Sequence, residues 1–145
     1  MTPDEDDLDF AAEHRVGHLL RRAYYRAKNT TNRLLKGIGV TPMQAATLMT
    51  LHRGPLSQAD LGRAIGMEPA NVHGLVARLK KMEFISIEPH PTDQRQRRVA
   101  LSPSGEHCAV KLAQLSAQSA EETLAVLAPA ERETLMHLLG RIALE

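Results

Sequence analysis

The chain of 145 residues is long enough for one domain with a sizeable core. Its single cysteine, Cys108, excludes an internal disulfide and is typical of a reducing cytoplasm. No stretch approaches the roughly 18 uncharged apolar residues of a membrane span, and the acidic start is opposite to that of a signal peptide. Aromatic residues make up only 3% of the chain. We therefore expect a cytoplasmic protein with an aliphatic core that suits the packing of helix on helix.

The net charge is only +1, but the charged residues are segregated along the chain. Six acidic and no basic residues precede Arg15, whereas residues 15–36 contain seven basic and no acidic residues. Such a basic segment can orient a chain on a polyanion or simply keep a helix soluble, and both interpretations stay open.

The first third of the chain predicts a tail and two helices. Residues 1–8 are expected to form an acidic flexible tail, followed by a long helix from about Asp9 to Lys36, along which apolar residues recur every three or four positions. Thr41 as N-cap and Pro42 at the first helical position predict a second helix over residues 42–52. The residues expected on its buried face are Met43, Ala46, Leu48, Met49 and Leu51.

The order of elements over residues 56–105 is that of a winged helix-turn-helix. Leu56 is expected to form a short strand, and Ser57 to cap a helix that ends at Ile65 before a turn at Gly66. A second helix is predicted over residues 69–82, followed by strands at 84–88 and 98–101. This second helix has the shape and polarity to enter a DNA major groove. The basic turn between the strands suits contact with the DNA backbone or minor groove.

Helical periodicity divides the two helices of this motif into a buried and an exposed face. The buried residues are expected to be Ala59, Leu61, Ala64, Ile65, Met67, Val72, Leu75, Val76 and Leu79. The residues left on the outer surface of the second helix are Ala70, Asn71, His73, Gly74, Ala77, Arg78 and Lys81.

The last third of the chain predicts two more helices. Ser102 and Pro103 are expected to open a long helix to about Leu127, and Pro129 a final helix to about Leu144. These helices carry more apolar residues than one small winged lobe needs to cover. The surplus favours an intertwined homodimer, with a monomeric helical bundle as the alternative.

The predicted fold class is mainly α with a small β-hairpin wing. Residues 9–145 are expected to form a single domain, in which residues 9–36 and 103–145 make a helical dimerisation region. Residues 42–102 would form the DNA-binding lobe.

The ordered motifs of this chain resemble the MarR family of bacterial transcriptional regulators. They are residues 39–44 (GVTPMQ), 57–61 (SQADL) and 71–79 (NVHGLVARL), followed by Asp93-Gln94-Arg95 and Val99-Ala100-Leu101-Ser102-Pro103-Ser104-Gly105. The resemblance runs from about Val16 to the C-terminus. It implies a dimer whose two winged lobes bind a pseudo-palindromic DNA operator, and repression is expected rather than activation.

The resemblance also implies roles for individual residues. Ser57 and Gln58 match a helix start that contacts phosphate, and Asp93 matches an acid that orders the wing by pairing with arginine. The DNA-contacting residues that we expect, from the resemblance or from the outer face of the second helix, are Ser57, Gln58, Ala70, Asn71, His73, Gly74, Arg78, Lys81, Arg95, Arg97 and Arg98. The chain departs from the family at Glu83, where most members have glycine, and at Ile87, where many have arginine. Glu83 must therefore adopt a positive φ or end the helix differently.

The family usually responds to a small molecule, often an aromatic carboxylate, so we expect such an effector and no required cofactor. Hydroxybenzoates, hydroxycinnamates and hydroxynicotinates are the compounds expected. The residues expected to bind the effector are His14, His18, Arg22, Met49 and His52, and Met43, His107 and Cys108 are further residues of the expected pocket walls.

Four other functions are weighed against effector-controlled DNA binding. Zinc sensing would use ligand types present in Glu13, His14, His18, His107 and Cys108, although no compact cluster fixes a tetrahedral site. Thiol sensing would use Cys108 alone. A nonspecific architectural DNA binder is disfavoured by the near-neutral charge. Catalysis is not expected, because there is no nucleophile elbow, phosphate-cradling glycine loop or convincing acid pair.

Overall fold

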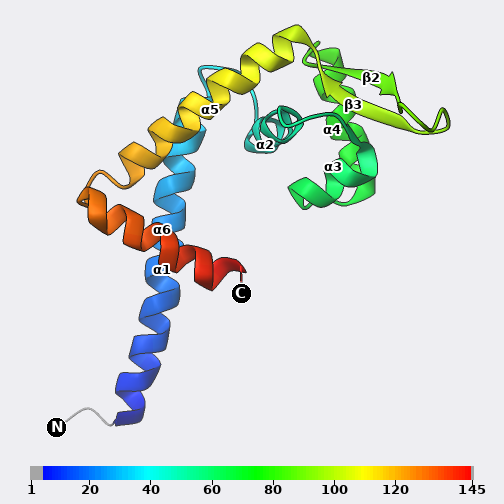
Figure 1. The fold of residues 1–145 in the computed structure, drawn as a ribbon. Coiled ribbons are helices and arrows are strands. Elements are labelled where there is room, and N and C mark those ends of the chain that lie inside the picture. Colours follow the sequence, from blue (N-terminus) through cyan, green and yellow to red (C-terminus); the bar gives the residue numbers. More distant parts are fainter. Residues whose placement is uncertain (1–4, 145) are drawn as a thin grey trace. The chain divides into compact units, whose positions relative to one another are not determined.

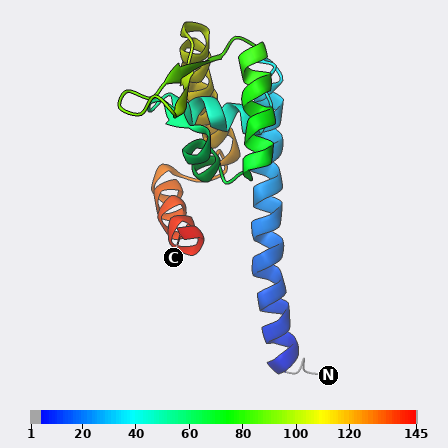
Figure 2. The ribbon, with the colours of Figure 1, turned by 90° about the vertical axis from the view of Figure 1, so that its right-hand side faces the viewer.

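The computed structural model describes the backbone of residues 5–144 and the side chains of residues 15–144. The chain divides into two compact units (Figure 1 and Figure 2). The helical unit consists of the described parts of residues 1–31 and 118–145, and the winged lobe consists of residues 32–117. The lobe is thus wider than the expected residues 42–102, because its core includes Leu35, Val40, Cys108 and Leu112.

The long first helix, α1 (Glu5–Leu35), begins four residues earlier than expected. The prediction of a flexible tail was therefore wrong for residues 5–8, and residues 1–4 lie outside the described part of the chain. Acidic residues stabilise the N-terminus of a helix through its macrodipole, which explains why the run Glu5-Asp6-Asp7 can form the first turn.

The helical unit also contains the end of α5 (Pro103–Thr123) and all of α6 (Pro129–Leu144). The hydroxyls of Thr31 and Ser119 form a hydrogen bond of 2.8 Å within this unit. Helix α5 ends four residues before the expected Leu127, because the chain must turn before Pro129, which disfavours a helical residue at position 128. The Glu131 carboxylate then accepts a hydrogen bond from the Ala128 amide at 2.8 Å and caps α6.

The winged lobe is built from short helices and a three-stranded antiparallel sheet. Its helices are α2 (Pro42–Leu51), α3 (Gln58–Ile65) and α4 (Pro69–Lys81), together with the start of α5. The strands are β1 (Leu56–Ser57), β2 (Ile85–Pro89) and β3 (Arg97–Leu101), in the order β1-β3-β2. The expected short strand at Leu56 is confirmed by its pairing with Val99. Mainly helical structure with a small winged sheet confirms the predicted fold class.

Capping residues set the helix boundaries of the lobe as the sequence predicted. Thr41 and Gln44 form a reciprocal capping box at the start of α2. The Ser57 hydroxyl accepts from the Asp60 amide at 3.1 Å, and the Ser102 hydroxyl accepts from the Gly105 amide at 3.0 Å. Gly66 ends α3 in the left-handed conformation with φ 67°.

Side chains of α2, α3, α4, β3 and α5 meet in one aliphatic core. Burying each such side chain contributes about 1.5–3 kcal/mol relative to leaving it in water. The side chains that are at most 2% exposed are Thr47, Leu48, Leu51, Leu61, Val72, Leu79, Val99, Ala109 and Leu112.

The predicted core was wrong for part of α2 and α3. Met43, Ala46, Ala59 and Ala64 are exposed, whereas Gln44, Ala45, Thr47 and Gly62 are buried.

Local hydrogen bonds and close packing explain why these polar and small residues are buried. The Thr47 hydroxyl can be buried because it donates to the Met43 carbonyl at 2.8 Å, and the Gln44 side chain is satisfied by its cap. Gly62 lies where α3 approaches α4, since a Cβ there would be 2.9 Å from Val72 Cγ2.

Glu83 follows the end of α4 and has a φ of 63°. The Glu83 amide donates to the Lys80 carbonyl at 3.0 Å, and the Phe84 amide donates to the Leu79 carbonyl at 3.1 Å. This is the Schellman pattern, which usually places glycine at the left-handed position. The Glu83 carbonyl in turn accepts from the hydroxyls of Ser102 and Ser104. Glu83 therefore takes the positive φ, and its strained backbone joins the end of α4 to the start of α5.

We expect Glu83→Gly to raise the free energy of unfolding by about 0.5–1 kcal/mol. A left-handed residue with a Cβ destabilises the fold by roughly 1–2 kcal/mol, and glycine removes this strain. The greater conformational freedom of glycine in the unfolded chain offsets about 0.4–1 kcal/mol of that gain. The Glu83 side chain is exposed, so its removal loses no core packing. Urea denaturation would measure the change. Glu83→Ala, which keeps the Cβ, serves as control, and equal stability of the two variants would contradict this account of the strain.

Candidate nucleic-acid interface

The start of α3 is held by a compact network of polar side chains. The Ser57 hydroxyl donates to Asp60 Oδ2 at 3.0 Å, and the Arg63 guanidinium pairs with Asp60 Oδ1. These contacts, with the Ser57 hydrogen bond first, lower the pKa of Asp60 below its usual value. The Ser57 hydroxyl is therefore engaged in capping the helix, and Gln58 beside it is half-buried.

Helix α4 presents the outer face that the sequence predicted. Its inner face buries Val72, Leu75, Val76 and Leu79 against the core. Its exposed residues are Pro69, Ala70, Asn71, His73, Ala77, Arg78, Lys80 and Lys81, while Gly74 is half-buried.

The side chain of Arg78 extends along this face towards Gly74. A Cβ placed on Gly74 would lie 3.7 Å from Arg78 Nη1. The absence of a side chain at Gly74 therefore leaves room beside the guanidinium, which a DNA backbone or base edge could occupy.

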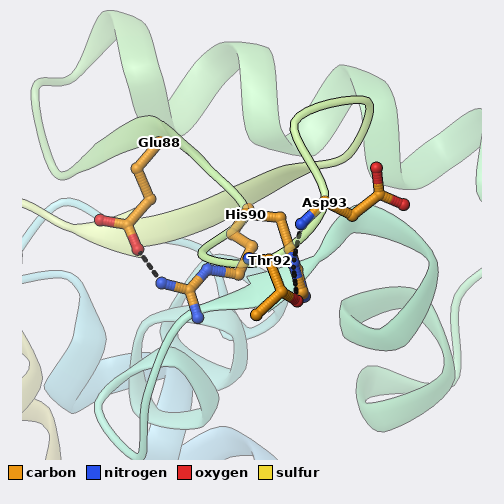
Figure 3. A network of polar contacts seen from close by, with 5 residues as sticks. Glu88, His90, Thr92 and Asp93 are labelled. Carbon is orange, nitrogen blue, oxygen red and sulfur yellow. Dashed lines mark hydrogen bonds and ion pairs between the residues drawn. The ribbon is translucent and has the colours of Figure 1, made fainter.

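The basic hairpin formed by β2, β3 and the turn between them carries three arginines, and two of them have exposed side chains. Arg95 and Arg97 are exposed. Arg98 instead donates from Nη2 to Glu88 Oε1 at 2.6 Å, directly across the two strands (Figure 3). Its Nε is buried without a hydrogen-bond partner among the described residues. The prediction that Arg98 contacts DNA thus meets a competing contact, which the sequence could reveal only with the strand register known.

Asp93 bonds to an arginine through the backbone of that residue. Asp93 Oδ1 accepts from the Arg95 amide at 3.0 Å. An aspartate that bonds the amide two residues later stabilises a tight turn, so Asp93 still orders the wing, through the backbone.

His90 stabilises the other side of the same turn. Its Nδ1 accepts from the backbone amides of Thr92 and Asp93 at 3.3 and 3.2 Å (Figure 3). His90 was not among the predicted site residues, although its position at the end of a strand before Pro-Thr-Asp was a signal for an amide-capping side chain.

The expected effector residues are divided between the two units. His18 and Arg22 are exposed on the α1 segment of the helical unit, and the side chain of His14 lies outside the described residues. In the winged lobe Met49 is half-buried, and His52 Nδ1 is 2.7 Å from Glu106 Oε2. Four of the five expected effector residues lie on α1 or α2, and His52 directly follows α2; Figure 1 labels both helices.

An open hollow of about 420 Å³ lies between α3 and the start of α4. Gln58, Arg63 and Pro69 are among the residues that line it, and none of the expected effector residues does. It adjoins the predicted DNA-facing surface rather than the predicted effector residues.

Neither a metal site nor a reactive thiol is supported by the described side chains. Among residues 15–144 no group of three histidine, cysteine or acidic side chains could hold a metal ion. Cys108 is 5% exposed, and burial raises the pKa of its thiol. A neutral, buried thiol is a poor nucleophile and a poor redox sensor. No described helix has the length and hydropathy needed to cross a bilayer.

Comparison with known proteins identifies the family. A model of the MarR family matches residues 38–96. The HTH-type transcriptional repressor NicR of Pseudomonas putida is 32% identical over 97% of this chain and 92% of its own. The chain belongs to the MarR family. The resemblance inferred from the ordered motifs is thereby confirmed.

Two solved structures are similar to most of this chain. A probable transcriptional regulator from Pseudomonas aeruginosa is 35% identical, with a TM-score of 0.76 over 88% of this chain and 96% of that chain. BpsR of Bordetella bronchiseptica, whose DNA binding is regulated by 6-hydroxynicotinic acid, is 30% identical, with a TM-score of 0.77 over 90% and 94%. The chain is thus a winged-helix transcriptional regulator of the MarR family.

Proposed function

We propose that this MarR-family protein is a homodimeric repressor that binds a pseudo-palindromic operator and is released by a small hydroxylated aromatic acid. The observation that carries the DNA-binding part is the basic surface formed by α4 and the wing. Its exposed cationic residues are Arg78, Lys80, Lys81, Arg95 and Arg97. In this proposal α4 enters the major groove, and the wing contacts the backbone or minor groove.

The exposed apolar residues of the helical unit support a homodimer. Tyr24, Val126 and Ile142 are 61%, 74% and 70% exposed in the single chain, and no residue of α6 is buried. Apolar surfaces of this kind mark association sites, and homo-oligomers usually form around a two-fold axis. Two-fold symmetry would match two lobes to two half-sites about 34–36 Å apart.

A hydroxylated aromatic acid is the effector class that we propose. The support is the similarity to BpsR, whose DNA binding responds to 6-hydroxynicotinic acid. His18 and Arg22, one helical turn apart on α1, are the side chains proposed to bind the carboxylate by charge-assisted hydrogen bonds. His14, Met49 and His52 are proposed as further contacts. The similarity to the repressor NicR supports repression.

The proposed mechanism is a shift between two populations of the dimer. An effector that binds more weakly to the dimer with DNA-competent lobe spacing shifts the population towards the dimer with the other spacing. A coupling free energy of about 1–3 kcal/mol is enough to lower operator affinity by about 5–150-fold.

Selection of a binding site from a randomised duplex pool tests the proposal. We expect the purified dimer to select an inverted repeat, and 6-hydroxynicotinate to lower its affinity for that duplex. If about 6–10 phosphates are contacted, affinity should fall by about 10³–10⁵ between roughly 50 and 200 mM salt. A monomer in light scattering, or equal affinity for random and selected duplexes, would contradict the DNA-binding part. Unchanged affinity across hydroxynicotinates, hydroxybenzoates and hydroxycinnamates would contradict only the effector class.

A pair of adjacent arginines provides a matched control for the effector site. Arg22→Gln should weaken the response to the effector while leaving operator affinity unchanged. Arg21→Gln removes the same charge from the neighbouring exposed position of α1 and should leave the response intact.

A further inference from the structure

We propose that His90 is a positioning residue for DNA binding, and that its neutral imidazole holds the turn of the wing in the shape that presents Arg95 and Arg97. The proposal rests on the proposed function, because it takes the wing to be a DNA-contacting element. It concerns a residue that lies outside the basic surface itself.

The contacts of His90 span the whole turn between β2 and β3. Its ring Nδ1 is 3.3 Å from the Thr92 amide and 3.2 Å from the Asp93 amide (Figure 3). The Thr92 hydroxyl lies 3.3 Å from the same nitrogen. The backbone amide of His90 donates to the Gln96 carbonyl at 3.1 Å on the opposite side of the turn.

Asp93 connects these contacts to the arginines. Its side chain accepts from the Arg95 amide, and its carbonyl accepts from the Gln96 amide at 3.1 Å. His90 therefore fixes the Asp93 backbone, and Asp93 fixes the backbone from which Arg95 projects.

Only a neutral imidazole can accept these hydrogen bonds. A neutral ring has one acceptor nitrogen, and here that nitrogen must be Nδ1, with the proton on Nε2. Protonation would place a third N–H group against the two amides of Thr92 and Asp93. Both hydrogen bonds would then be lost, and the turn would open.

The hairpin that carries His90 contains five charged residues. They are Asp93 and Arg95 in the turn, Arg97 on β3, and the Glu88–Arg98 pair one position further along the strands. Among the described residues no ion pair involves His90, and the tip of the hairpin projects beyond the helices of the lobe (Figure 1). Hydrogen bonding to the turn is therefore the main interaction that a change of charge on His90 would alter.

The direction of the pH effect separates this role from simple charge attraction. A histidine changes charge between about pH 5 and 8. Added positive charge on a DNA-facing wing would strengthen binding to phosphates. Loss of the turn would weaken it instead, because Arg95 and Arg97 would no longer be held in one arrangement.

His90→Asn and His90→Ala form a matched pair for the test. Asparagine Oδ1 is separated from the backbone by the same number of bonds as histidine Nδ1 and accepts amide hydrogen bonds without titrating. At about pH 7.5 we expect wild type and His90→Asn to bind the selected duplex equally well, and His90→Ala about 3- to 10-fold more weakly. At about pH 5.5 wild type should become weaker than His90→Asn by a similar factor. The pH dependence left in His90→Asn reports groups other than His90.

Amide hydrogen exchange without DNA measures the turn directly. Exchange of the Thr92 and Asp93 amides should be faster in His90→Ala, and faster in wild type at the lower pH once intrinsic rates are corrected. Equal duplex affinity of His90→Ala and wild type, or stronger binding of wild type than of His90→Asn at the lower pH, would overturn the proposal. If wild type bound no duplex at all, the proposed function would fail, and amide exchange would still decide whether His90 holds the turn.

Discussion

Gly105→Ala should destabilise the winged lobe by about 3 kcal/mol or more. A Cβ at Gly105 would lie 1.9 Å from the Phe84 carbonyl oxygen and 2.9 Å from its carbon. Both atoms belong to the backbone, so no side chain can rotate away to make room. Overpacking usually costs about 1–3 kcal/mol, and a clash with fixed backbone belongs at or above the upper end of this range.

The clash would disrupt the joint between α4 and α5. The Phe84 carbonyl accepts from the Ser102 amide at 3.0 Å, and the Phe84 amide closes the end of α4. Pushing Phe84 away therefore breaks contacts of both helices at once. Urea denaturation would show a lower midpoint, with loss of folded protein during purification as the more severe form of the same result.

Gly74→Ala is the control for this prediction. A Cβ at Gly74 meets only the Arg78 side chain at ordinary contact distance, and glycine within a helix costs about 0.5–1 kcal/mol relative to alanine. We therefore expect unchanged or slightly higher stability. A Gly105→Ala protein as stable as Gly74→Ala would contradict the close approach of α5 to Phe84.

Arg78→Ala and Arg95→Ala should each lower affinity for the selected duplex by at least about 30-fold without unfolding the protein. A good base contact is worth about 1–3 kcal/mol, and a dimer loses it in both half-sites. Both side chains are exposed, so their removal leaves the core intact. Binding titrations over a range of salt concentrations would also show a smaller salt dependence, by about one unit of slope for each lost phosphate contact.

Lys111→Ala controls for the loss of positive charge alone. Lys111 is exposed on α5 of the same lobe and is not among the residues that we assign to DNA contact. Its replacement should change affinity little. Retained affinity in both arginine variants would refute the residue assignment, and equal losses in all three variants would indicate nonspecific charge attraction.

Local signals account for what the sequence predicted well. Thr41, Ser57 and Ser102 each cap a helix with their own side chains, so the starts of α2, α3 and α5 follow from a few neighbouring residues. The prediction of the inner face of α4 was also correct, because its buried apolar residues recur at helical spacing.

Where the prediction failed, the deciding contact joins residues far apart in the sequence or depends on turn geometry. Helix α2 consists mostly of apolar and small residues, so periodicity alone could not show that Met43 is exposed and Thr47 buried. The Glu88–Arg98 pair needs the strand register, and the contacts of His90 need the path of the turn. At Glu83 the sequence posed two alternatives, and the structure decided between them.

The isolation of Cys108 gives this protein a practical advantage for spectroscopy. It is the only cysteine of the chain, and its thiol is buried with a raised pKa, so a maleimide or nitroxide reagent should react with it slowly. A Gln94→Cys variant would add one exposed thiol at the tip of the wing. Labels attached there on two copies would form a molecular ruler, and the distribution of distances between them would follow the two lobes as DNA and small acids are added.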